Sequence, residues 1–111
     1  MRPRLYYMWN IPRSVVLIVI AICADYDRRK NAIENEDVSG RVLSEFERFN
    51  NVIDRALEDV EPGLRRIMLN DVANRKGYGN TLSSPFLAKN TYYNRKRKLV
   101  HDIAAGLGLI E

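Results

Sequence analysis

Cysteine, histidine and tryptophan are scarce in this chain, since each occurs only once among its 111 residues. The single cysteine, Cys23, allows no disulfide within the chain, and nothing therefore points to an oxidising compartment. One cysteine and one histidine, His101, cannot form a cluster with the spacing of a zinc site. We expect no structural metal and no cofactor.

No group of side chains has the pattern of a catalytic site. The sequence Gly77-Tyr78-Gly79 lacks the Lys-Ser/Thr that would follow in a phosphate-binding loop. Its glycines indicate the end of a helix instead. His101 is followed directly by Asp102, but adjacent residues on a helix do not face each other. Because an enzyme needs a convergent set of groups, we do not expect this protein to be an enzyme.

Long hydrophobic runs are also lacking. The longest run, VVLIVIAICA at residues 15–24, has ten residues, whereas a transmembrane helix needs roughly 20. We therefore expect no membrane-spanning segment and no membrane partner.

This run has two further interpretations. Three arginines precede it, as in a secretory signal peptide, and release at Ala24 would leave a secreted cationic helical protein. However, Ile22 stands where such a cleavage site requires a small residue. The alternative is a buried helix over residues 12–35, because apolar positions continue at helical spacing beyond the run. We favour the buried helix and expect Ile18 to lie in its core.

Later segments also repeat apolar residues at helical spacing. One follows a cap at Asp37 or Ser39, and its apolar positions are Val42, Phe46, Phe49, Ile53, Leu57 and Val60. Another begins at Pro62, and its apolar positions are Leu64, Ile67, Met68 and Val72. The sequence therefore predicts one all-α domain over residues 1–111, with scaffold helices in 12–60 and a C-terminal helix-turn-helix in 61–111.

The end of the chain has the pattern of this helix-turn-helix. Residues 86–88 would form a short first helix, and Asn90 would cap the final helix. In that helix one apolar stripe consists of Tyr92, Leu99, Ile103 and Leu107. The first turns are polar and basic instead. A recognition helix needs this arrangement, because its first turns contact DNA while the rest packs in the core.

Charge is distributed unevenly along the chain, although the formal net charge is only +4. Residues 31–60 carry three basic and eight acidic side chains, whereas residues 61–111 carry nine basic and four acidic ones. Such asymmetry suggests one face for nucleic acid and another for a different partner. The candidate DNA-binding residues are Lys76, Lys89, Thr91, Tyr93, Asn94, Arg95, Arg97 and Lys98.

These candidates have different expected roles. Arg97 lies off the apolar stripe, and we expect it to contact base edges together with Asn94. We assign Arg95 and Lys98 to phosphates, with Lys89 and Lys76 as outer phosphate contacts. For Tyr93, contact with DNA and simple exposure remain equally open.

Two stretches carry a resemblance to a known family. They are IDRALEDVEPGLRRIMLNDV and SSPFLAKNTYYNRKRKLVHDIAAGLGLI, which together cover about residues 50–110. They resemble the small phage-type transcriptional regulators of the ArpU and RinA sort, whose C-terminal half is similar to region 4 of sigma factors. The shared features are the Thr-Tyr-Tyr opening at residues 91–93, the basic stretch that follows it, and the final Leu107-Gly108.

The resemblance implies sequence-specific binding of double-stranded DNA and control of phage or prophage genes. We therefore expect a cytoplasmic transcription regulator, in which the scaffold helices also offer a contact for RNA polymerase or for a homodimer. The main alternative is a small phage inhibitor or adaptor whose basic helix binds an acidic surface of another protein. Binding to random duplex DNA that weakens with salt distinguishes the two, because an adaptor need not show it.

Overall fold

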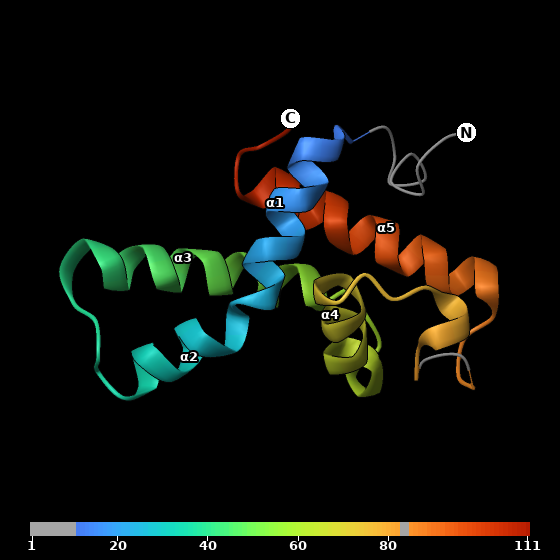
Figure 1. Cartoon of the computed structure of the whole chain (residues 1–111), viewed down its shortest axis with the longest axis horizontal. Coiled ribbons are helices and arrows are strands. Elements are labelled where there is room, and N and C mark those ends of the chain that lie inside the picture. Colours follow the sequence, from blue (N-terminus) through green and yellow to red (C-terminus); the bar gives the residue numbers. More distant parts are fainter. Residues whose placement is uncertain (1–10, 83–84) are drawn as a thin grey trace.

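The computed structural model describes residues 11–82 and 85–111, and within these ranges the protein is all-helical, as predicted (Figure 1). The α-helices are α1 (Arg13–Ala24), α2 (Tyr26–Glu34), α3 (Gly40–Leu57), α4 (Arg65–Ala73) and α5 (Lys89–Gly106). Two 3-10 turns accompany them, η2 (Pro62–Leu64) and η3 (Tyr78–Asn80). The arginines at positions 2 and 4, and Ser84, lie outside the described residues.

The core lies where α1, α4, α5 and the C-terminal half of α3 meet. In Figure 1, α1 crosses in front of α5 and runs down towards α4. The largest fully buried side chains are Tyr92, Ile53, Met68, Leu99, Ile103, Val16, Val19, Val72 and Val100. The predicted stripe of α5 is therefore in the core at Tyr92, Leu99 and Ile103, while Leu107 is half-buried.

The apolar run at residues 15–24 forms α1 and contributes Val16, Val19 and Cys23 to the core. Ile18, which we expected in the core, is instead 43% exposed. The run is apolar on every face, and its sequence alone does not show which face is turned inwards. No helix within the described ranges is both long and apolar enough to cross a membrane.

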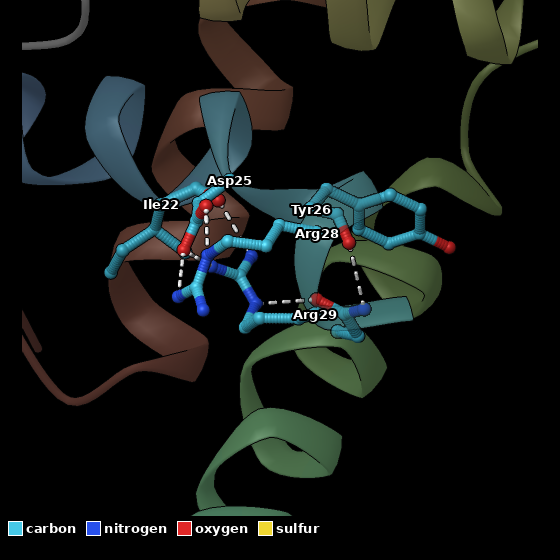
Figure 2. Close-up of polar contacts among 6 residues, drawn as sticks. Ile22, Asp25, Tyr26, Arg28 and Arg29 are labelled. Carbon is cyan, nitrogen blue, oxygen red and sulfur yellow. Dashed lines mark hydrogen bonds and ion pairs between the residues drawn. The ribbon is translucent and has the colours of Figure 1, made fainter. Parts of the chain in front are cut away.

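The single helix predicted over residues 12–35 is wrong, because the chain breaks at Asp25 (φ −98°, ψ 7°) into α1 and α2. The buried guanidinium of Arg29 stabilises this break by donating to the carbonyl oxygen of Ile22 (2.6 Å) and to Oδ1 of Asn50 (2.7 Å). Asn50 in turn donates to the carbonyl oxygen of Tyr26 (3.2 Å). Figure 2 shows these bonds at the junction. They hold α2 beside α3, and the two helices form an arm on one side of the body (Figure 1).

The connection between α4 and α5 also differs from the prediction. Residues 86–88 are not helical, and Phe86 is 69% exposed. A three-residue helix cannot recover the cost of nucleation unless its side chains are buried, and the exposed phenyl ring gains nothing. The predicted short first helix is therefore wrong, and the described ranges do not show the tight two-helix motif. Because α5 begins at Lys89 after an extended Ala88, Asn90 lies in its first turn and is not the N-cap.

Candidate nucleic-acid interface

A buried polar network fixes α5 against the chain that follows α4. The phenol of Tyr92 lies 3.1 Å from Oδ2 of Asp71 and 3.1 Å from the carbonyl oxygen of Lys76, and can donate to either. Thr81 also donates to Asp71, and Lys96 donates to the Lys76 carbonyl. Burial, reinforced by the charge of Asp71, raises the pKa of Tyr92 above its ordinary value, so its hydroxyl stays a donor. The network sets the position of Lys76 relative to α5.

Two of the predicted phosphate contacts are paired with carboxylates of this chain. Arg95 forms a bidentate ion pair with Glu61, in which Nε donates to Oε1 (3.0 Å) and Nη2 donates to Oε2 (3.2 Å). Lys98 lies 2.6 Å from Asp102 and 2.7 Å from Asp59. The hydrogen bond from Arg95 lowers the pKa of Glu61, and the one from Lys98 lowers that of Asp59. All of these side chains stay partly exposed, so a competing anion can reach them.

Sequence reasoning did not identify Asp59 and Glu61 as neighbours of the basic helix. They lie 39 and 34 residues before their partners, in the connection that follows α3. Helical spacing relates residues three or four apart, and it carries no information over such separations. The only sequence signal is a general one: acidic residues are concentrated in residues 31–60, which include Asp59 and end next to Glu61.

The two predicted base contacts, Asn94 and Arg97, bind each other. The Nη2 group of Arg97 donates to Oδ1 of Asn94 at 2.6 Å. Asn94 is exposed, while Arg97 is half-buried on the flank of the helix. The Nε–H group of Arg97 is buried and meets no hydrogen-bond acceptor among the described residues. Because an unsatisfied buried donor is costly, Arg97 would gain from an acceptor that reaches it.

The remaining candidates lie around the first turns of α5. Lys89 and Lys76 are exposed, and Thr91 is half-buried. Tyr93 is also half-buried: its ring packs edge-to-face on Tyr92, and its hydroxyl oxygen accepts a hydrogen bond from the backbone N–H of Tyr78. In this structure Tyr93 therefore holds the loop. The exposed cation Arg75, next to Lys76, was not among the predicted contacts.

His101 and Asp102 are closer than helical geometry predicted. Nδ1 of His101 lies 3.2 Å from Oδ1 of Asp102, so the expectation that these neighbours do not face each other was wrong. Both side chains are partly exposed, and Asp102 also pairs with Lys98. The contact joins His101 to the charged cluster that surrounds Lys98.

These observations define a small all-helical domain with a long helix, α5, whose apolar stripe is buried and whose first half carries basic side chains. Comparison of the chain with family models, with curated proteins and with solved structures finds no match.

Proposed function

We propose that this protein binds double-stranded DNA through the first half of α5 and regulates transcription of phage or prophage genes in the cytoplasm. The observation that carries the proposal is the two-sided character of α5. Tyr92, Leu99 and Ile103 are buried, while cationic and amide groups line the rest of the same helix. A helix that enters the major groove needs a core-anchored stripe and a polar outer side.

The residues divide into base and phosphate contacts. Asn94 and Arg97 are the proposed base contacts, because an amide matches adenine and a guanidinium matches guanine. Arg95 and Lys98 contact phosphates by exchanging Glu61 and Asp59 for DNA. Exposed ion pairs are worth only about 0–1 kcal/mol, and a line of phosphates therefore competes with them readily. In place of the tight motif, α4 and residues 74–82 support α5 in the helix-turn-helix role.

The proposal is tested by titrating a random-sequence duplex at several salt concentrations. Each phosphate contact that is removed should weaken binding to all sequences and reduce the salt slope by about 1, as expected for Lys98→Ala. Arg97→Ala should instead cost about 1–3 kcal/mol on a selected site and relax the preference at one base pair. Arg41→Ala is the matched control, since it removes an exposed cation at the start of α3.

Two results would contradict the proposal. One is a wild-type protein that does not bind duplex DNA at low salt. The other is unchanged affinity after simultaneous replacement of Arg95, Arg97 and Lys98 by alanine.

A second candidate function is an adaptor that binds an acidic protein surface through the same helix. The observation in its favour is that Arg95 and Lys98 already hold the carboxylates of Glu61, Asp59 and Asp102. An adaptor would keep its affinity for an acidic protein in the Arg97→Ala variant. It would show no salt-dependent binding to random duplex DNA. The titration above therefore separates the two functions.

A further inference from the structure

The turn that ends α4 has a strained backbone at Arg75, whose φ of 55° lies in the left-handed region. The N–H of Lys76 donates to the carbonyl oxygen of Asp71 (2.9 Å), and the N–H of Arg75 donates to that of Val72 (3.3 Å). These two bonds define a Schellman motif, in which the left-handed residue is usually glycine because a side chain makes this conformation costly. The same motif at the end of α5 does have a glycine, Gly108 (φ 76°).

The backbone at this turn is fixed beside the first half of α5. The carbonyl oxygen of Lys76 lies 3.1 Å from the hydroxyl of Tyr92 and accepts a hydrogen bond from Lys96. Tyr92 and Lys96 are one turn apart on α5, so the contact spans two turns of that helix. The Cα atoms of Arg75 and Lys76 are about 3.8 Å apart, as in any pair of neighbours. The strained residue is therefore held next to the helix that is proposed to bind DNA.

The side chain of Arg75 is exposed, and it forms no hydrogen bond or ion pair with a residue in 11–82 or 85–111. In contrast, the exposed guanidinium groups of Arg28, Arg48 and Arg66 each hold a carboxylate. A guanidinium carries five N–H donors in a planar fork that matches the geometry of a phosphate. The adjacent Lys76 is also exposed. Two neighbouring cations therefore lie at a fixed position beside α5, where an anion can reach both.

We propose that Arg75 binds a phosphate of double-stranded DNA next to Lys76, and that this contact is the reason for an arginine in place of glycine at the strained position. The contact rests on the proposed function, because it belongs to the same DNA site. Strain by itself does not indicate a contact, since Glu36 (φ 57°) ends α2 in the same motif. That connection lies on the opposite side of the molecule from the start of α5 (Figure 1). Arg75 differs from Glu36 in its positive charge and in its place beside α5.

The substitution Arg75→Gly should change stability and DNA binding in opposite directions. Glycine adopts the left-handed conformation without strain, so the melting temperature should rise by about 2–5 °C. Loss of the phosphate contact should weaken binding to a random-sequence duplex and reduce the salt slope by about 1. Arg75→Lys keeps the charge and the strained backbone, and it should leave both quantities close to those of the wild type.

Two control variants separate the effects of strain and of charge. Glu36→Gly relieves the same backbone strain at the end of α2, and it should raise the melting temperature without changing the salt slope. Arg41→Ala removes an exposed cation at the start of α3, and it should leave the salt slope unchanged. Only Arg75→Gly should combine a higher melting temperature with a smaller salt slope.

The possible failures are distinguishable. A wild type that binds duplex DNA, together with an Arg75→Gly variant of unchanged salt slope, would overturn the Arg75 contact and leave the proposed function standing. A wild type that does not bind DNA at low salt, as expected of an adaptor for acidic proteins, would overturn both. An equal loss of slope in Arg41→Ala would show that only net charge matters. A melting temperature that does not rise in Arg75→Gly would show that the arginine stabilises the fold, which also contradicts the proposal.

Discussion

Nε of Arg29 donates a 2.7 Å hydrogen bond to Oδ1 of Asn50, and both side chains are buried. The bond joins α2 to the middle of α3 beside the break at Asp25. Burial lowers the pKa of Arg29 from its ordinary value, while the carboxylate of Asp25 acts in the opposite direction. The guanidinium stays charged, and it therefore depends on Asn50 and on the carbonyl oxygen of Ile22 for compensation.

Replacing Asn50 by alanine should destabilise the protein by about 1–3 kcal/mol, because a buried charged donor loses its acceptor. Urea unfolding followed by circular dichroism measures the change. The control is Asn51→Ala, which truncates an exposed amide one position further along α3 and should change stability by less than about 0.5 kcal/mol. Equal effects of the two substitutions would mean that the Arg29–Asn50 bond does not hold the arm.

Val19 and Ile18 should respond oppositely to the same substitution. Val19 is fully buried, and Val19→Asp should unfold the domain, because an unpaired charge in the core costs several kcal/mol. Ile18→Asp should leave a folded protein, since that side chain can reach water. Thermal melting of both variants checks the orientation of α1, which a folded Val19→Asp variant would contradict.

Truncating the core stripe of α5 should also be costly. Leu99 and Ile103 are at most 1% exposed, and each change to alanine should cost about 2–5 kcal/mol. Leu107→Ala, at the half-buried end of the stripe, should cost clearly less. Denaturant titration provides the comparison, and a loss below about 0.5 kcal/mol at Leu99 would show that the stripe faces solvent.

The thiol of Cys23 should be inert in the folded protein. Burial raises its pKa from 9.0 to about 12, so the thiol stays protonated near neutral pH. As the pH rises, the thiol of the unfolded chain ionises at a lower pH than the buried thiol of the folded protein. The stability contribution of the protonated form is therefore complete below pH 9.0 and is lost progressively towards pH about 12. Iodoacetamide labelling at pH 8 should be slow without urea and fast in unfolding urea, and rapid labelling of the native protein would place Cys23 outside the core.

Releasing Arg95 should strengthen DNA binding. Glu61→Gln removes the carboxylate that holds the guanidinium at 3.0 Å, which leaves Arg95 available to a phosphate. Glu47→Gln is the control, because it makes the same change in net charge at an exposed position of α3. In titrations at low salt, the affinity should rise more for Glu61→Gln than for Glu47→Gln. Equal gains would show that only net charge matters and that Arg95 contacts no phosphate.

The apolar periodicity of the sequence was sufficient to predict an all-helical protein and the burial of Tyr92, Leu99 and Ile103. Such periodicity depends on neighbours three or four residues apart, which local spacing describes well. The charge distribution likewise identified the basic start of α5. The DNA-binding roles of its residues remain proposals.

Only the tertiary structure decided which face of α1 is buried, because a run that is apolar on every side has no preferred direction of its own. It also decided the break at Asp25, since Arg29 is held there by a buried bond to Asn50 of α3, and the pairing of Arg95 and Lys98 with Glu61 and Asp59. These contacts join residues more than 20 positions apart. Their formation depends on how the helices pack, and a local sequence pattern contains no information about that packing.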